Sequence, residues 1–143
     1  MDKALLDTDI FSEILKGIDR AVVRRAVAYR VVWTRYTTST ITVLEVVKGL
    51  HKVGREQALQ QFLAGMSAVE LLTLDLGSAE LAGRIYADLE RTGQPMGRAD
   101  PIVAAIALQQ DLTLVTGNLA HYRRIQSLGY ALKLEDWREP IGE

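Results

Sequence analysis

Short apolar runs alternate with longer stretches of helical periodicity along the whole chain. The apolar runs have the length of buried strands, and they cover residues 4–6, 69–74, 112–116 and 131–134. The longer stretches repeat apolar positions every three or four residues, which predicts helices. These helices cover residues 10–15, 21–28, 41–50, 57–68 and 78–91, followed by one that begins at Asp100 and a short one after Asn118.

Several element boundaries carry signals of their own. Asp9 or Ser12 can cap the first helix, and the hydroxyl cluster at residues 37–39 can cap the helix that follows it. Asp100 and the proline after it predict a helix start, because the aspartate can accept from free N–H groups and proline has no N–H to leave unpaired. Residues 31–33 fit either a short strand or a loop.

The order of these elements predicts an α/β protein. Strands and helices alternate, and the long crossovers between strands imply a mainly parallel central sheet with helices on both faces. No repeat or low-complexity linker divides the chain. We therefore expect residues 1–143 to form a single domain.

Composition narrows the chemistry that the chain can perform. The formal net charge of −1 over 143 residues does not by itself indicate a nucleic-acid-binding protein. The absence of cysteine excludes disulfides, thiolate metal sites and a cysteine nucleophile, and it is consistent with a reducing cytoplasm. Because the sequence has no signal peptide and no apolar run of about 18 residues, we expect a soluble, cytoplasmic protein with no membrane partner.

One segment is strongly basic. Arginines outnumber acids between Asp19 and Arg35, where Asp19 is the only carboxylate. These arginines form either a solvated helix face and loop or a surface for phosphate groups or an acidic partner.

Polar side chains from separate segments fall at one predicted edge of the sheet. Asp7 follows the first strand, Asn118 follows a later strand, and Asp100 lies at a helix N-terminus. Ligands of such sheets bind beyond the carboxyl ends of the strands. Glu45 interrupts an apolar run, where a carboxylate is costly unless it is paired or binds a metal. We expect these four side chains to converge on one site.

Each of these residues also has a purely structural interpretation. Asp7 and Asn118 can be turn residues at strand ends, and Asp100 can act only as a helix cap. Glu45 can pair with Lys48 one helical turn later. Convergence favours a site nevertheless, because unrelated turn and cap residues need not meet at one edge.

Oxygen ligands of this kind select a hard cation such as Mg²⁺, for which Mn²⁺ can substitute. Clustered carboxylates repel one another, and a divalent ion neutralises that repulsion. Such an ion polarises a phosphodiester and lowers the pKa of a bound water. His51 and His121 lie in different segments without the spacing of metal ligands, so we expect surface or partner roles for both.

A series of short motifs follows one order along nearly the whole chain. The motifs are Leu5-Leu6-Asp7-Thr8-Asp9, residues 39–45 with Gly49, residues 93–97 before Asp100, Ile102 with Ala104 and Ala105, residues 114–118, and residues 134–137. In this series the sequence resembles the PIN-domain ribonuclease family. Within that family, it is most similar to the VapC-type toxins of bacterial type II toxin–antitoxin systems.

The resemblance implies a PIN-like three-layer α/β/α sandwich and a Mg²⁺-dependent endoribonuclease. Such an enzyme cuts structured RNA, often tRNA or ribosomal RNA, with a metal-activated water. The resemblance also implies a cognate VapB-like antitoxin as inhibitor and a homodimeric assembly. It places the metal on Asp7, Asp100 and Glu45, and it includes Asn118 in the catalytic set. The remaining implied roles are orientation of ligands or water by Thr8, Ser39 and Thr116 and contact with RNA phosphate by Arg98.

Two positions depart from the family pattern. Asn118 stands where a fourth acid is frequent, so the site has one negative charge fewer and a second tightly held metal is in doubt. His121 stands where a further acid often follows.

Three alternatives remain open at this point. A phosphatase of the haloacid-dehalogenase type would use Asp7 as nucleophile, but Lys133 comes late for its lysine and no acidic pair lies near Asp100. A catalytically weak PIN domain would bind RNA or a partner without cutting. A PIN nuclease outside toxin–antitoxin systems would act in RNA processing.

Overall fold

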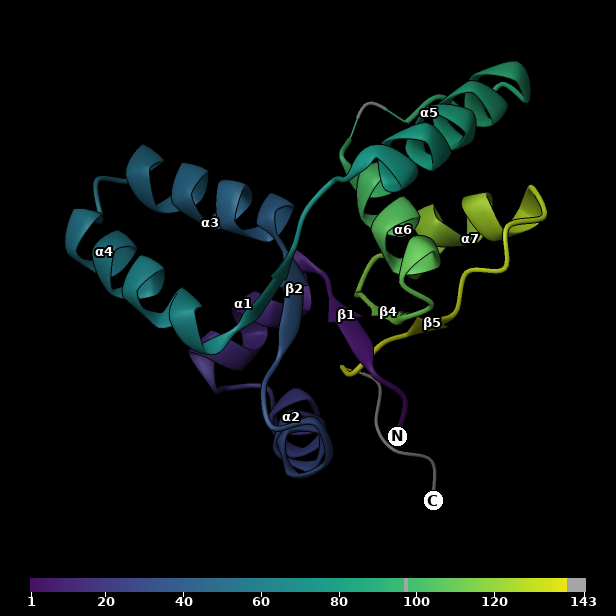
Figure 1. Ribbon diagram of the computed structural model, residues 1–143. Helices are drawn as coiled ribbons and strands as arrows, with labels where there is room; N and C mark the ends of the chain where they lie inside the picture. Colours follow the sequence, from purple (N-terminus) through teal and green to yellow (C-terminus); the bar gives the residue numbers. More distant parts are fainter. Residues whose placement is uncertain (97, 139–143) are drawn as a thin grey trace.

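The structure, a computed structural model, describes residues 1–96 and 98–138. Strands and helices alternate along this part of the chain (Figure 1). The strands are β1 (Ala4–Leu6), β2 (Thr37–Ser39), β3 (Glu70–Leu72), β4 (Thr113–Val115) and β5 (Leu134–Glu135). The helices are α1 (Thr8–Lys16), α2 (Arg20–Trp33), α3 (Thr40–Lys52), α4 (Glu56–Gly65) with a 3₁₀ turn at Met66–Ala68, α5 (Leu76–Arg91), α6 (Asp100–Gln109) and α7 (Leu119–Ser127).

All five strands join one sheet in the order β3-β2-β1-β4-β5, and every pairing is parallel. Strand β1 lies at the centre, where Leu6 pairs with Thr38 of β2 and with Val115 of β4. The carboxyl ends of β1, β2 and β4 therefore lie side by side at one edge. The predicted α/β class with a parallel sheet is confirmed.

The alternation of side chains along β1 divides the core between the two faces of the sheet. Leu5 belongs to the apolar cluster formed with α5, α6 and α7. Ala4 and Leu6 belong to the other cluster, which contains buried residues of α1, α2 and α4. Helices cover both faces in Figure 1, which confirms the predicted three layers. All three β1 side chains are almost fully buried, as expected for a central parallel strand.

Helix α1 begins directly after β1 and is capped by Asp7, whose Oδ1 accepts from the backbone N–H of Thr8 at 2.9 Å. The expected caps, Asp9 and Ser12, are instead residues of the helix. The strand-to-helix connection is therefore a single residue. Asp7 is held rigidly at the sheet edge as a result.

The two interpretations of residues 31–33 as strand or loop are both wrong, because α2 continues through them to Trp33. The hydroxyl cluster at residues 37–39 is strand β2 rather than a capping segment. Ser39 does occupy the N-cap position of α3, but its side chain makes no capping hydrogen bond.

The predicted capping role of Asp100 is also wrong. Asp100 is the first residue of α6, and Ala99 holds the N-cap position without a side-chain hydrogen bond. Proline does lie in the first turn, as the sequence indicates. The Asp100 carboxylate is thereby left for another role.

None of the helices in residues 1–96 and 98–138 combines the length and the apolar character that a membrane crossing requires.

Candidate active site

Asp7 is the hub of a polar cluster at the carboxyl edge of the sheet. Its Oδ2 accepts from the hydroxyl of Thr116 at 2.9 Å and from the phenol of Tyr122 at 3.0 Å. Its Oδ1 accepts from the backbone N–H of Thr8. Strand β1 places this carboxylate where only 7% of the residue is exposed. Three donors from three elements thus fix one buried carboxyl group.

Burial raises the pKa of Asp7 from 3.8 to about 6, with a further contribution from the nearby Asp9 carboxylate. The hydrogen bonds from Thr116, Thr8 and Tyr122 lower the pKa but do not cancel these two causes. The charged form of Asp7 is therefore costly in the protein alone. A strongly shifted acid at a sheet edge is a feature of functional sites.

Tyr122 lies on α7 between several carboxylates. Burial raises its pKa, and the charges of Asp7, Asp100 and Asp9 raise it further, in that order. The phenol consequently remains a hydrogen-bond donor to Asp7. The sequence analysis did not identify Tyr122, because a lone tyrosine at a helical apolar position is indistinguishable from a core residue.

Asp100 faces α7 rather than the N–H groups of its own helix. Its Oδ2 lies 3.1 Å from Nδ1 of His121, and the aspartate is 9% exposed. The His121 side chain contacts this predicted metal ligand while it is 32% exposed, so the expected surface or partner role stays a prediction. In the sequence, His121 was marked only by its departure from the family pattern, in which an acid often stands at this position.

Glu45 reaches the site from α3, but it is exposed rather than set in an apolar neighbourhood. The reasoning from an apolar run was wrong, because the helix turns residue 45 outward. Its Oε1 accepts from the hydroxyl of Thr8 at 2.6 Å, which replaces the pairing with Lys48 that the sequence allowed. Thr8 also shares a hydrogen bond of 3.0 Å with Thr42. Thr8 thus connects Glu45 to the residue after Asp7.

Ser39 is the one predicted orienting residue whose side chain has no partner in the described residues. Its Oγ is buried and makes no hydrogen bond, and the residue is 1% exposed. Because Leu6 pairs with Thr38, Ser39 lies beside Asp7 at the sheet edge. Strand alternation turns it away from the Leu6 face and toward the Leu5 face, where α6 and α7 lie. Buried hydroxyls without a partner are rare in proteins, so this hydroxyl is available to bind a ligand or a water.

Thr116 and Asn118 come from the loop after β4. The hydroxyl of Thr116 donates to Asp7 and accepts from the backbone N–H of Asn118 at 3.0 Å. Asn118 holds the N-cap position of α7 without a side-chain capping bond. Its amide is therefore not used to cap the helix.

A second network fixes this loop from outside. Asp9 Oδ2 accepts from the N–H of Gly117 at 2.8 Å, and Arg138 donates to the carbonyl of Gly117 at 2.7 Å. A Cβ on Gly117 would overlap the ends of both side chains. Arg138 also pairs with Asp136. Arg138 was not identified from the sequence, because its partner Gly117 is 21 positions away.

Arg98 is exposed just before α6, and its carbonyl accepts from the phenol of Tyr86 at 2.8 Å. Contact with RNA phosphate stays a prediction for this residue. Gly97, the last residue of the motif at residues 93–97, lies outside the described residues.

The donor set suits a hydrated divalent ion. Within residues 1–96 and 98–138, no three acidic or histidine side chains lie close enough to hold one ion together. Mg²⁺ usually keeps several waters and binds through only one or two carboxylates, so such a trio is not required. The unpaired Ser39 hydroxyl and the uncompensated charge of Asp7 both fit a cation with its water at this edge.

Several known proteins are similar to this chain in sequence and in fold. The PIN-domain family profile matches residues 4–126. The tRNA(fMet)-specific endonuclease VapC of Salmonella typhimurium is 30% identical over 138 residues, which are 96% of this chain and 99% of that protein. The crystal structure of DNA-bound VapBC from Salmonella typhimurium aligns with a TM-score of 0.79 at 30% identity, over 96% of this chain and 99% of that one. The VapBC-1 structure from nontypeable Haemophilus influenzae also gives 0.79, at 25% identity over 95% and 98%.

The chain therefore belongs to the PIN-domain family. Within that family it is one of the VapC ribonucleases, the toxins of VapBC toxin–antitoxin systems. This membership excludes the alternative of a haloacid-dehalogenase-type phosphatase. It also removes the third alternative, a PIN nuclease outside toxin–antitoxin systems.

Proposed function

We propose that this VapC is a Mg²⁺-dependent endoribonuclease that acts in the cytoplasm on structured RNA such as tRNA or ribosomal RNA. Asp7 and Asp100 bind the ion directly, and Glu45 binds it directly or through water. Mn²⁺ substitutes for Mg²⁺. The observation that carries this proposal is the buried Asp7 carboxylate with a raised pKa beside the unpaired hydroxyl of Ser39.

The chain's own residues hold the reacting groups in place. Thr116 and Tyr122 fix one oxygen of Asp7, and Thr8 fixes the other through its N–H while its hydroxyl holds Glu45. A bound divalent ion would polarise the phosphodiester and supply an activated water. Asn118 removes one negative charge compared with an acid at that position. The site is therefore suited to one tightly held ion rather than two.

The names of the relatives and the exposed cations of this chain support the proposed RNA substrate. The Salmonella relative is named as an endonuclease specific for tRNA(fMet). In this chain, Arg98, Arg123 and Arg124 are exposed on α7 and on the segment before α6. Guanidinium groups bind phosphate with two parallel hydrogen bonds. We expect these arginines to position a folded RNA rather than to select its sequence.

Cleavage of a tRNA mixture by the purified protein tests the proposed reaction. The wild type should cut with Mg²⁺ and stop when EDTA is added. Asp7→Asn should lower the rate about a hundredfold, because the ion loses a direct ligand. Asp2→Asn, which changes an exposed acid near the same strand, is the matched control and should cut normally. RNA that is bound but left uncut by the wild type would favour the catalytically weak alternative.

An apolar groove between α1, α3 and α4 provides a place for the antitoxin. The cavity has a volume of about 690 Å³. Its apolar walls include Phe11, Ile14, Leu15, Val46, Leu50 and Phe62. Three cations, Lys16, Arg30 and Arg55, also line it, and none of its described lining residues is acidic.

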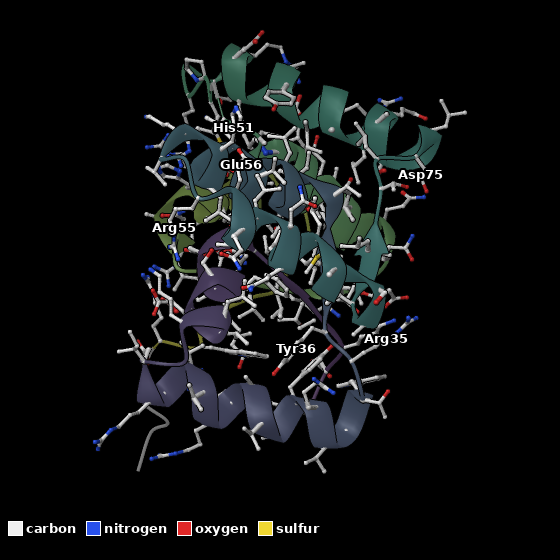
Figure 2. All side chains as sticks on the ribbon, turned by 90° about the vertical axis from the view of Figure 1, so that its left-hand side faces the viewer. Arg35, Tyr36, His51, Arg55, Glu56 and Asp75 are labelled. Carbon is white, nitrogen blue, oxygen red and sulfur yellow. The ribbon has the colours of Figure 1, made fainter. Side chains whose placement is uncertain are left out.

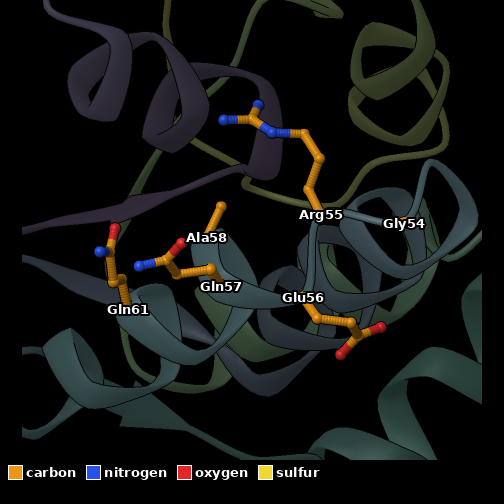
Figure 3. A pocket seen from close by; sticks show the side chains of 6 residues that line it. All are labelled: Gly54, Arg55, Glu56, Gln57, Ala58 and Gln61. Carbon is orange, nitrogen blue, oxygen red and sulfur yellow. The ribbon is translucent and has the colours of Figure 1, made fainter.

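The charges around the groove define the partner's chemistry. Arg55 at the start of α4 and Tyr36 near α2 both lie on this side of the molecule (Figure 2). Figure 3 shows a second pocket that shares Arg55, Ala58 and Gln61 with the groove. There, the side chains of Arg55 and of Glu56, the first residue of α4, extend in opposite directions, so the cation faces away from its acidic neighbour. We infer that the groove binds an amphipathic antitoxin segment with apolar residues on one face and acids beside them. Such a segment is what a VapB-like antitoxin would supply.

Co-purification with the product of the adjacent reading frame tests this partner. Leu15→Glu changes a groove residue that is 57% exposed, so it should prevent complex formation without unfolding the protein. Leu63→Glu is the matched control, because Leu63 is exposed on α4 and does not line the groove. Equal binding by both variants would contradict the groove assignment.

A homodimer is the proposed assembly of the free toxin. Leu44, Leu74 and Leu76 are exposed, and Leu76 is 88% exposed. We expect the dimer interface to cover these side chains, because burial of apolar surface favours association. Light scattering should give twice the mass of 15.9 kDa for the wild type. Leu76→Glu should lower that mass if this residue lies in the interface.

A further inference from the structure

We propose that Arg138 is a positioning residue for the reaction, because it fixes the Asp7 carboxylate through the peptide group between Gly117 and Asn118. The inference rests on the proposed function, in which Asp7 is a direct ligand of the ion. Arg138 is not itself a ligand. Its side-chain hydrogen bonds within the described residues go to Asp136 and Gly117.

Three hydrogen bonds connect the guanidinium of Arg138 to the carboxylate of Asp7. Arg138 Nη2 donates to the carbonyl of Gly117 at 2.7 Å. The N–H of the same peptide group, which belongs to Asn118, donates to Oγ1 of Thr116 at 3.0 Å. The Thr116 hydroxyl then donates to Asp7 Oδ2 at 2.9 Å. Arg138 therefore acts on Asp7 through one peptide group and one hydroxyl.

The atoms themselves set the direction of each bond in this relay. A guanidinium and a backbone N–H can only donate, and a carbonyl and a carboxylate can only accept. The Thr116 hydroxyl has a single proton, and its oxygen accepts from Asn118, so the proton goes to Asp7. Because a peptide group is planar, a bond that fixes its carbonyl also orients its N–H. Bonds linked in this way polarise and strengthen one another.

The close approach of Arg138 to this peptide requires a glycine at position 117. Gly117 does not have a positive φ, so its role is not to permit a left-handed backbone. A Cβ there would instead overlap the guanidinium of Arg138 and the carboxylate of Asp9. Asp9 accepts from the N–H of Gly117 at 2.8 Å. The loop is thus held at both the N–H and the carbonyl of one residue, which limits any shift of Thr116.

Asp136 holds the guanidinium of Arg138 in one orientation. Nε and Nη2 donate to the two carboxylate oxygens of Asp136 at 3.3 and 3.2 Å. The backbone N–H of Arg138 donates to the same carboxylate at 2.9 Å. A planar guanidinium suits such a two-oxygen contact, which the single ammonium of a lysine does not reproduce. Although the Arg138 side chain is 43% exposed, its direction is therefore defined.

A direct contact with RNA phosphate is the competing role for an exposed arginine beside the site. The two roles differ in their kinetics. A phosphate contact is made with the substrate and contributes mainly to KM, whereas a positioning residue acts on the reacting groups and contributes to kcat.

Three single variants separate these roles. Arg138→Ala removes the whole relay contact, and Arg138→Lys keeps the charge but not the two-oxygen contact with Asp136. Arg84→Ala is the matched control, because Arg84 is an exposed arginine of α5 that pairs with Glu80, one helical turn away.

Cleavage of a tRNA that the wild type cuts, with Mg²⁺ present, gives the first measurement. Arg138→Ala should lower kcat about tenfold and leave KM nearly unchanged. Arg138→Lys should recover part of this loss, and Arg84→Ala should behave as the wild type. When Thr116→Val is already present, Arg138→Ala should have little further effect on kcat, because the relay is then already broken.

Amide hydrogen exchange in the metal-free protein gives a second measurement that does not depend on activity. The N–H of Asn118 should exchange about tenfold faster in Arg138→Ala than in the wild type, because its peptide group is no longer fixed. Arg84→Ala should leave this exchange rate unchanged.

Three results would overturn the inference. A higher KM with an unchanged kcat in Arg138→Ala would make Arg138 a phosphate contact. Additive losses of kcat in Arg138→Ala and Thr116→Val would show that Arg138 does not act through Thr116. An unchanged exchange rate at Asn118 would reject the relay.

Two further outcomes are kept apart from these. If Arg138→Ala fails to fold by circular dichroism, Arg138→Lys decides by the same measurements, with smaller expected losses. If the wild type cuts no RNA, the proposed function is rejected, and the exchange rate of Asn118 still decides whether the relay exists.

Discussion

The phenol of Tyr122 donates a hydrogen bond of 3.0 Å to Oδ2 of Asp7, across 115 positions of the chain. This contact joins α7 to the carboxyl end of β1. It also stabilises the charged form of Asp7, which is buried away from water. Because the hydrogen bond lowers the pKa of Asp7, its loss has a predictable dependence on pH.

Tyr122→Phe should reduce the free energy of unfolding by about 1–3 kcal/mol at pH 8, where Asp7 is charged. The loss should shrink at pH 5, below the Asp7 pKa of about 6, because the neutral carboxyl needs the donor less. Urea unfolding at both pH values measures this. Tyr86→Phe is the control, since Tyr86 donates to a neutral carbonyl and its cost should not depend on pH. A pH-independent cost for Tyr122→Phe would contradict the assignment.

The raised pKa of Asp7 predicts how stability of the metal-free protein changes with pH. The folded state binds the Asp7 proton more tightly than the unfolded state, whose pKa is near 3.8. Stability from this group is therefore present below pH 4 and is lost as pH rises through about 6, by about 2–3 kcal/mol in total.

Asp7→Asn isolates this contribution. The difference in unfolding free energy between Asp7→Asn and the wild type should grow in favour of the variant between pH 4 and pH 7. Acids that do not interact with Asp7, such as Glu70 with its lowered pKa, affect both proteins equally and cancel in the difference. Asp2→Asn should show a flat difference. A flat curve for Asp7→Asn as well would mean that Asp7 is not destabilised by its own charge.

Ser39→Ala should have opposite effects on the metal-free and the metal-loaded protein. Removal of an unpaired buried hydroxyl should leave the stability of the metal-free protein unchanged or raise it. The stabilisation that Mg²⁺ adds should fall, because the hydroxyl can no longer bind the ion or its water. Thermal unfolding with and without Mg²⁺ separates the two effects. An equal loss under both conditions would show that Ser39 serves only packing.

Gly117→Ala should destabilise the protein by about 1–3 kcal/mol, because the added Cβ displaces the ends of Arg138 and Asp9. Much of that cost should disappear when Arg138→Ala is already present, which a double-mutant cycle measures. Gly83→Ala is the control, since nothing lies near a Cβ at this position of α5 and the change should stabilise the helix. Additive costs for Gly117→Ala and Arg138→Ala would contradict the network.

Four of the five described strands were predictable because their information is local, whereas β2 (Thr37–Ser39) was interpreted as a capping segment. Short apolar runs separated by long helical patterns leave a parallel sheet as the simplest arrangement, and Asp7 at the end of β1 follows from that sheet directly. The end of α2 was not predictable in the same way. Its final valines favour a strand by propensity, but packing of Tyr29 against Tyr36 and Trp137 keeps the segment helical.

The site was only partly predictable, because its decisive contacts are tertiary. Asp7 and Asp100 carried signals at strand and helix ends. Glu45 was identified because it interrupts an apolar run, but that reason was incorrect. The orientation of α3 about its own axis, which the sequence does not show, leaves Glu45 exposed. His121, Tyr122 and Arg138 each act through a partner at least 20 positions away, and no spacing along the chain indicates such a pair.

Anomalous diffraction from crystals soaked in Mn²⁺ tests the central claim most directly. The account predicts one strong peak at the carboxyl edge of the sheet, about 2.0–2.3 Å from carboxylate oxygens of Asp7 and Asp100. A well-ordered crystal with no peak there, in which Asp7 contacts only Thr8, Thr116 and Tyr122, would contradict it.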